Sequence, residues 1–431
     1  MRIAFAGNQN NYPFMLARAL RRAGHQVLFI VDRPEALNRP EARYPDLRAG
    51  YPEWIETAEP LTIDDVVFRT PRWTRLLARL ATADAVVLNG WTFAAAADLD
   101  QPAICLATGS DLEFYANRRA AGRYARNQDL QPRERTWVGT TLHLASIDAP
   151  ALLDLAGRLP APAHYAWRWF VFRAFVARQR AGFARARAVA YLPTGTVPVG
   201  DRLISELRPG DAPLTLLMTD TDALQPAPLP VNARLRVFNS ARLDWRRPFP
   251  PMVADWENKG GDVLLRGIAL FTARTGTGID LHLVAKGQSV DATRALAAAL
   301  GLESSITWHG EMSQHDVFEQ YRLADVVADQ LGGHMPGLST FDAMALGRPV
   351  LANGRPDSLG PALGAALPVA QASTPEEVAR QLERLTRLVE RRRLALKARV
   401  FAERHLSSDL AAARVIAALT SAASERAARA A

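Results

Sequence analysis

Hydrophobic and polar positions alternate along the first half of the chain in blocks typical of strands and helices. Residues 2–7, RIAFAG, form a short apolar run, and residues 13–24, PFMLARALRRAG, have the spacing of an amphipathic helix. Short continuous apolar runs separated by helices predict a parallel sheet that is covered on both faces. Further apolar runs that end in turn residues lie at 25–32, 83–90, 102–111, 187–193 and 214–220.

A parallel sheet of this kind binds ligands at the carboxyl ends of its strands. The polar segments that follow the predicted strands are 7–12, 89–91 and 108–111. We therefore expect these three segments to surround one crevice.

A proline-rich stretch without periodicity divides the chain. Residues 224–236, LQPAPLPVNARLR, contain three prolines, which indicates a linker. After this stretch the alternation of strand and helix resumes, and from residue 374 onward the pattern is helical. The sequence thus predicts an α/β protein of two Rossmann-like doubly wound domains that face each other across a cleft. The predicted ranges are 1–225 for the first domain, 226–233 for the linker, 234–405 for the second domain, and 406–431 for a final helix that can cross back to the first domain.

Composition narrows the class of protein. The 431 residues are 48% hydrophobic and 22% charged, as in a folded soluble protein, and the formal net charge of +8 favours anionic partners. Cys105 is the single cysteine, so no intrachain disulfide forms, and we expect it in the core. The N-terminus lacks a signal-peptide pattern, and no apolar run approaches the roughly 20 residues of a membrane span, so we expect a cytoplasmic protein. No metal-ligand spacing and no nucleic-acid motif is present, and the oligomeric state is not predictable.

One loop carries the main chemical signal. Residues 329–354 read DQLGGHMPGLSTFDAMALGRPVLANG, a glycine-rich loop that enters an apolar helix. Such a loop brings backbone N–H groups and the positive end of a helix to one point, which suits a phosphate. Gly332, Gly333 and Gly337 permit close approach of a ligand, and Asp342 is placed to accept hydrogen bonds from ribose hydroxyls. An ordinary strand-to-helix turn explains the loop equally well when it is taken alone.

The segments around this loop resemble the donor site of retaining family-4 glycosyltransferases of the GT-B fold. FDAMALGRPVLA, with ADVVADQLGGHMPGLST before it, is similar to their signature, and NSARLDW, NKGGDVLLRGI, LHLVAKG and ITWHGEMSQHDVFEQYRLADV follow the same order upstream. In the first half, ATGSDL and LLMTDTDALQP are more weakly similar. The resemblance implies that a nucleotide-diphosphate sugar, UDP- or GDP-linked, is a co-substrate in polysaccharide biosynthesis, without an obligate metal.

The resemblance also implies roles for individual residues. Arg242 and Lys259 would hold the donor diphosphate as catalytic residues, and Asp111 would be an acid on the acceptor side. Asp111 also suits a helix N-cap, and both interpretations stay open. The remaining implied contacts fall into two sets. The donor would contact Gly7, His334, Gly337, Leu338, Ser339 and Asp342, and the acceptor side would include Asn10, Asn11 and Thr108.

Two residues depart from the family pattern. His334 stands where many relatives have a Glu that contacts the transferred sugar, and Thr108 stands where many have a His. A histidine still hydrogen-bonds a hydroxyl but lacks the strong acceptor of a carboxylate.

The resulting hypothesis is transfer of a sugar to a hydroxyl of a glycan, a lipid-linked or a small-molecule acceptor, with retained anomeric configuration. No enzymic nucleophile is evident, which favours a front-face route in which the diphosphate accepts the acceptor proton. A catalytically silent module that binds nucleotide sugar or glycan and scaffolds a partner is the alternative. A sugar-nucleotide epimerase is less well supported, because its cleft acids are not evident.

Residues 164–188, HYAWRWFVFRAFVARQRAGFARARA, combine aromatic residues with arginines. As a helix, this stretch suits the surface of an anionic membrane, which would bring the protein to a lipid-linked acceptor. A helix buried against the first sheet explains it as well.

Overall fold

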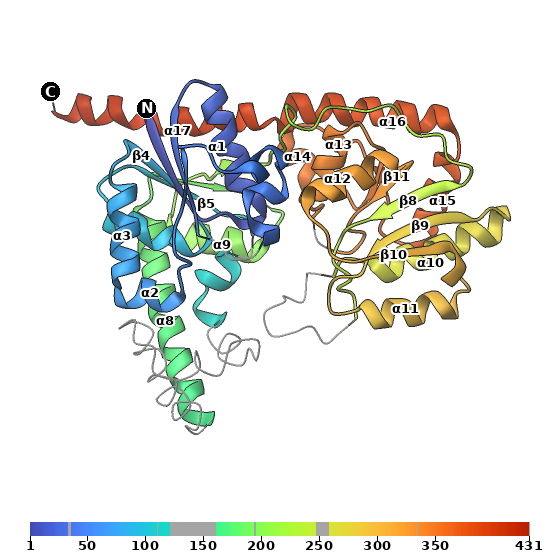
Figure 1. Ribbon diagram of the computed structural model, residues 1–431, viewed down its shortest axis with the longest axis horizontal. Helices are drawn as coiled ribbons and strands as arrows, with labels where there is room; N and C mark the ends of the chain where they lie inside the picture. The colour runs from blue at the N-terminus through green and yellow to red at the C-terminus, as the bar shows by residue number, and fades with distance from the viewer. Residues whose placement is uncertain are drawn as a thin grey trace.

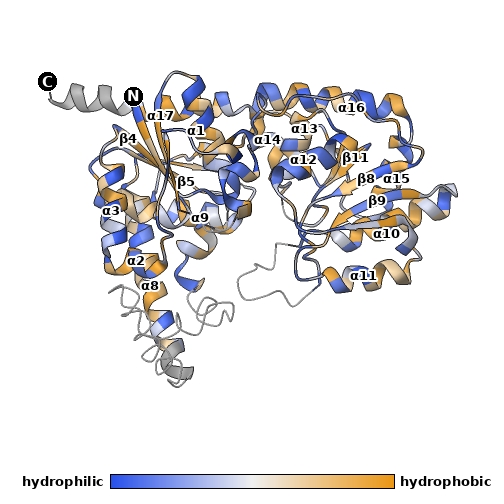
Figure 2. Ribbon diagram, viewed as in Figure 1, coloured by the Kyte–Doolittle hydropathy of each residue, from blue (hydrophilic) through white to orange (hydrophobic). Residues whose placement is uncertain are grey.

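The computed structural model describes residues 1–32, 36–109, 111–120, 161–193, 195–246, 258–333 and 335–430. Each half of the chain forms one parallel sheet covered by helices, and the two domains lie side by side (Figure 1). The strands are hydrophobic almost throughout, whereas the covering helices carry hydrophobic and hydrophilic stripes (Figure 2). The predicted α/β architecture of two Rossmann-like domains is confirmed.

The N-terminal sheet has the strand order β3-β2-β1-β4-β5-β6-β7. All neighbours are parallel, and Phe5 on β1 pairs with Phe29 on one side and Val87 on the other. Cys105 is buried in this domain, as predicted. The strands are β1 Arg2–Ala6, β2 Gln26–Val31, β3 Ile55–Thr57, β4 Ala85–Asn89, β5 Ala103–Leu106, β6 Ala188–Tyr191 and β7 Leu214–Thr215. The covering helices are α1 Tyr12–Arg22, α2 Ile63–Phe68, α3 Pro71–Leu80, α4 Ala95–Asp98, α8 Ala161–Arg185 and α9 Pro198–Leu207.

The C-terminal sheet repeats this plan with the order β10-β9-β8-β11-β12-β13. In both sheets the strand order reverses beside the first strand, between β1 and β4 and between β8 and β11, which is where doubly wound sheets bind ligands. The strands are β8 Leu235–Asn239, β9 Ile279–Val284, β10 Ile306–His309, β11 Val326–Ala328, β12 Val350–Ala352 and β13 Ala370–Gln371. The helices are α10 Gly261–Thr275, α11 Val290–Ala299, α12 Gln314–Leu323, α13 Leu338–Ala345, α14 Leu359–Leu363, α15 Pro375–Leu385 and α16 Leu388–Phe401.

The chain crosses between the domains twice. It leaves the first domain after β7, and residues 225–232 contain no helix or strand. It returns through helix α17, Ser408–Ala430, which lies along α1 (Figure 1). The two crossings touch, because the Thr219 N–H donates to Leu406 O at 2.7 Å and the Ser408 N–H donates to Thr219 O at 3.0 Å. Residues of α17 that are buried against the first domain are Ala411, Ala412, Val415 and Leu419.

The basic aromatic stretch forms helix α8, which behaves differently along its length. Its second half is core: Phe175 and Phe183 are fully buried, and Gln179 donates to Gly90 O and accepts from the Ala94 N–H. Its first half extends below the domain (Figure 1) and exposes large aromatic side chains. Within the ranges given above, no helix is both long enough and apolar enough to span a membrane.

Candidate functional site

A cavity of about 640 Å3 lies between the domains, where the strand ends of both sheets meet. From the first domain, Asn10 and Thr108 contribute to its wall. From the second domain, the predicted residues that line it are Arg242, Lys259, Gly337, Leu338, Ser339 and Asp342. The residues predicted from the sequence thus come together from five separate segments of the chain.

Arg242 and Lys259 come from two loops of the second domain. Arg242 follows β8, and its Nε lies 3.2 Å from Asp244 Oδ2, while nearly half of its side chain stays exposed. Lys259 precedes α10, and its Nζ donates to Gln330 Oε1 at 3.2 Å. Both cations therefore face the same cavity, and contacts with Asp244 and Gln330 hold their side chains in place. This arrangement suits an anionic ligand.

Two glycines bring the Lys259 segment against the glycine-rich loop. Gly260 has φ of +70°, and a Cβ on it would lie 2.5 Å from the Gly332 backbone nitrogen. A Cβ on Gly332 would lie 2.0 Å from Asn258 O. The two backbones approach this closely only because neither residue has a side chain, and the Leu331 N–H donates to Lys259 O at 3.1 Å.

Lys286 is a third cation in the cavity wall, and sequence reasoning did not single it out. It follows β9 and is half-buried. Burial lowers the pKa of its ammonium group, as does Arg242, while Glu311 opposes the shift. The available signal was the lone basic residue of the motif LHLVAKG, which lies two positions after β9 at the sheet edge where ligands bind.

The glycine-rich loop is held by a side chain. The buried carboxylate of Asp329 accepts from the Gly337 N–H at 2.8 Å, from Thr340 Oγ1 at 2.6 Å and from Ser339 Oγ at 3.1 Å. The Gly337 N–H, which the resemblance assigns to the donor, is therefore already bonded within the protein. The physical reason is that Asp329, at the end of β11, supplies the negative charge at the start of α13. Leu338 and Ser339 remain in the first turn, where N–H groups have no acceptor within the helix.

Asp342 has partners that the sequence did not indicate. Its two carboxylate oxygens accept from Arg43 Nη1 and Nη2 at 2.9 and 2.8 Å, and Oδ1 also accepts from Thr219 Oγ1 at 2.6 Å. Among the described residues that line the cavity, Asp342 alone carries a carboxylate.

The first domain contacts α12 through a turn after β1. Asn10 and Asn11 both have positive φ, 55° and 56°, which is costly for residues other than glycine and is typical of functional segments. Gln314 of α12 donates to Asn10 O at 3.1 Å and accepts from Asn11 Nδ2 at 3.0 Å. Gly7 lies beneath this turn, where a Cβ would be 2.1 Å from Asn89 O, so it packs against the backbone of β4.

Asp111 is fully buried under the Thr108 turn. Its Oδ2 accepts from the Thr108 N–H at 2.8 Å and from Thr108 Oγ1 at 3.0 Å, and Asn89 Nδ2 lies 3.3 Å away. Thr108 thus lines the cavity and Asp111 supports it from behind. His334 lies outside the described residues.

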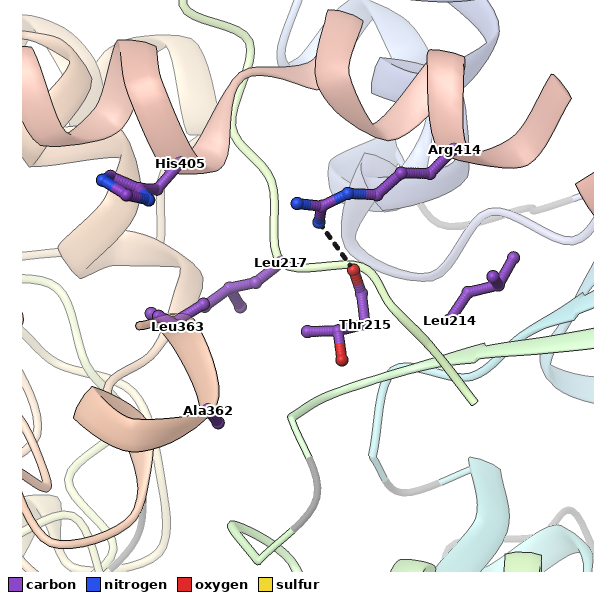
Figure 3. A pocket seen from close by; sticks show the side chains of 7 residues that line it. All are labelled: Leu214, Thr215, Leu217, Ala362, Leu363, His405 and Arg414. Carbon is purple, nitrogen blue, oxygen red and sulfur yellow. Dashed lines mark hydrogen bonds between the residues drawn. The ribbon is translucent and has the colours of Figure 1, made fainter. Parts of the chain in front are cut away.

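A smaller hollow of about 170 Å3 is present where the last helix begins (Figure 3). Its walls come from both domains, with Leu363 and His405 on one side and Leu214 and Arg414 on the other. Arg414 donates to Thr215 O at 3.0 Å, and Leu217 lines both hollows.

Known proteins share this architecture. Sucrose-phosphate synthase from Thermosynechococcus elongatus superposes with a TM-score of 0.56 at 15% identity, over 98% of this chain and 100% of its own. The HepE protein of Anabaena, solved in complex with UDP and glucose, gives 0.56 at 13% identity over 98% and 100%. A glycosyltransferase from Rickettsia africae gives 0.56 at 11% identity over 97% of each chain.

In sequence, no curated protein matches the chain. Residues 252–387, which include the glycine-rich loop and α13, match the family of group 1 glycosyl transferases. The GT-B fold that the resemblance implies is confirmed, and within the second domain residues 252–387 are similar to group 1 glycosyl transferases.

Proposed function

We propose that the protein transfers a glycosyl group from a nucleotide-diphosphate sugar to a hydroxyl of a glycan, a lipid-linked or a small-molecule acceptor, with retained anomeric configuration. The observation that carries this proposal is the convergence of Arg242, Lys259 and Lys286 on one cavity beside the first turn of α13. Fixed cations stabilise a departing nucleoside diphosphate, whose negative charge grows as the sugar leaves. This arrangement supports catalysis without a metal.

The front-face route has support from the same cavity. A double displacement needs an enzymic nucleophile, usually a carboxylate next to the sugar. Asp342 is the single carboxylate among the described lining residues, and both of its oxygens already accept hydrogen bonds from Arg43. The departing diphosphate itself would therefore accept the acceptor proton, while Arg242 and Lys259 hold it in place.

The first experiment is a thermal-shift panel of UDP, GDP and their sugars, because a ligand that binds the folded state raises the melting temperature. UDP-glucose is a natural first donor, since HepE was solved with UDP and glucose. We expect one base to give a clear shift that Arg242→Ala and Lys259→Ala abolish. Lys397→Ala changes an exposed lysine on α16 and should keep the shift. Unchanged donor affinity in both cavity variants would remove the basis for this site.

A silent binding module remains the second candidate, because His334 and Thr108 stand where many relatives have a Glu and a His. Measurement of turnover distinguishes the enzyme from the silent binding module. An enzyme releases nucleoside diphosphate faster when an acceptor is added, whereas a binding module does not. NMR of the anomeric proton in the product then decides between retention and inversion, and interconversion of free nucleotide sugars would indicate an epimerase instead.

We place the enzyme in the cytoplasm, in peripheral contact with the inner face of the membrane. The first half of α8 exposes Tyr165, Trp169 and Phe170, and Arg173 lies 4.6 Å from the ring centroid of Trp169. Aromatic side chains flanked by arginine suit an interface of anionic headgroups. Flotation with phosphatidylglycerol vesicles should recover the wild type at low salt and lose the Trp169→Ala/Phe170→Ala variant. Leu396→Ala, on the exposed face of α16, is the matched control. If the wild type does not bind the vesicles, the membrane contact is refuted and α8 serves only as a core helix of the first domain.

A further inference from the structure

Arg43 reaches from the first domain into the second and pairs with Asp342. It lies between two 3-10 turns, Pro40–Ala42 and Pro45–Ala49, that follow β2. The side chains of Arg43 and Asp342 are only 1% and 7% exposed. The guanidinium also lies 4.8 Å from the ring centroid of Phe318 on α12. The pair is therefore shielded from water, and Arg43 packs on Phe318 of the second domain.

The pair stands beside the two crossings between the domains. Thr219, which donates to Asp342 Oδ1 at 2.6 Å, is the residue whose backbone joins the two crossings. The neighbour of Arg43 continues the contact, because Tyr44 OH donates to Asp220 Oδ2 at 2.8 Å. A rotation of one domain against the other must move Arg43 relative to Asp342. We call Arg43, Asp342 and Thr219 the domain clasp.

A ribose could bind the Asp342 carboxylate only by replacing hydrogen bonds that this carboxylate already accepts. The Asp342 carboxylate accepts three, two from a guanidinium and one from a hydroxyl. The 2′- and 3′-hydroxyls of a ribose offer two, and neither donor is charged, so each bond is weaker than one from arginine. Displacement would also leave the Arg43 guanidinium buried without its counter-charge, which is the most unfavourable outcome for a buried ion pair. Replacement of Arg43 and Thr219 by a ribose at the Asp342 carboxylate is therefore unfavourable in free energy.

We propose that Arg43 is a positioning residue that keeps Asp342 in the domain clasp while donor is bound, so that the enzyme holds its nucleotide without reading the ribose through that carboxylate. This inference rests on the proposed function for its donor, and it replaces the ribose contact that the sequence predicts for Asp342. The donor is then held through its diphosphate by Arg242, Lys259 and Lys286. Arg43 acts by setting the angle at which the first domain meets the donor cavity.

The test measures the binding of two ligands to two protein variants, in the manner of a double-mutant cycle. Calorimetry measures the affinity of UDP and of 2′,3′-dideoxy-UDP, or of the GDP pair if the thermal-shift panel selects GDP, for the wild type and for Asp342→Asn. We expect loss of the ribose hydroxyls to weaken binding by the same factor in both proteins, within about twofold. A penalty of roughly tenfold or more in the wild type that disappears in Asp342→Asn would show a carboxylate–ribose contact and overturn the proposal.

A second arm tests the clasp itself and needs no ligand. Small-angle scattering should give a larger radius of gyration for Arg43→Met and for Asp342→Asn, and the double variant should lose no more melting temperature than the worse single variant. Additive losses with an unchanged scattering profile would refute a clasp. If Arg43→Met does not fold, Thr219→Val, which removes one bond of the same carboxylate, is measured in its place. Arg75→Met is the matched control, because the Arg75–Glu59 pair is exposed and lies within the first domain.

The two arms also separate this inference from the proposed function. If no nucleotide binds, the proposed function fails, and the scattering and melting data still decide whether Arg43 holds the domains together.

Discussion

Lys286 allows the most detailed test of the donor cavity. Its ammonium lines the cavity and makes no hydrogen bond within the described part of the chain. Methionine has a similar length without the charge, so Lys286→Met removes the cation and retains the packing of the stem. A hydrogen bond to a charged group contributes about 1.5–3 kcal/mol, so the variant should bind nucleoside diphosphate about 10- to 150-fold more weakly.

The pH dependence gives a second and independent signature of Lys286. Burial lowers its pKa in the free protein, and a bound diphosphate must raise that pKa because it stabilises the charged form. Binding therefore takes up a proton once the pH exceeds the pKa of the free protein. Affinity is full below that pKa and falls as the pH rises through it, until the pKa of the complex is reached.

Titration calorimetry measures both effects. The dissociation constant is determined across an alkaline pH series, and proton uptake is obtained from buffers that differ in enthalpy of ionisation. Lys286→Met should lose the uptake that the wild type shows, and Lys397→Met, on the exposed face of α16, should keep it. Equal affinity and equal proton uptake in Lys286→Met and wild type would refute a role for this cation.

Three further predictions concern the loop and the chemistry. Gly332→Ala places a methyl group 2.0 Å from Asn258 O and should cost about 1–3 kcal/mol of stability together with most donor binding, as seen in melting curves with and without nucleotide. Gly278→Ala, whose added methyl group would lie 3.7 Å from Arg234 Nη1 and away from the cavity, should leave both unchanged. Asp329→Asn replaces the acceptor at the start of α13 and should lower the free energy of unfolding in urea by about 1.5–3 kcal/mol, whereas the exposed Asp291→Asn should not. Transfer activity should survive EDTA, and its loss with recovery on adding Mg²⁺ or Mn²⁺ would contradict metal-independent chemistry.

The features that sequence predicted well depend on local periodicity. Apolar runs predicted the strands of both sheets except the short edge strands β3 and β13. Residues just after those runs, such as Arg242 and Thr108, had to reach the same edge because parallel strands end together. The order of the motifs around 329–354 supplied the rest of the donor side. These inferences need only a few neighbouring residues and the rules of doubly wound sheets.

The features that sequence missed depend on how the two domains meet. Arg43 and Asp342 are 299 positions apart, and neither residue carries a local pattern that names its partner. The contact of Asn11 with Gln314 spans 303 positions. Asp329 was overlooked for another reason: the glycines of segment 329–354 point to a ligand, and nothing in the sequence shows that the Asp329 carboxylate accepts hydrogen bonds from Gly337 and Thr340. Residue types that suit a ligand also suit an internal partner, and only the three-dimensional arrangement distinguishes the two.

The return of α17 to the first domain has a consequence for biosynthesis. The apolar face of α1 receives its cover from Val415 and Leu419, about two hundred residues after β7 completes the first sheet. At translation rates of roughly 5–20 residues per second, that face stays uncovered on the nascent chain for on the order of 10–40 s. The first domain is thus synthesised first, but its hydrophobic packing is complete only after α17 has been synthesised. An apolar face that is exposed for this interval favours binding of a ribosome-associated chaperone.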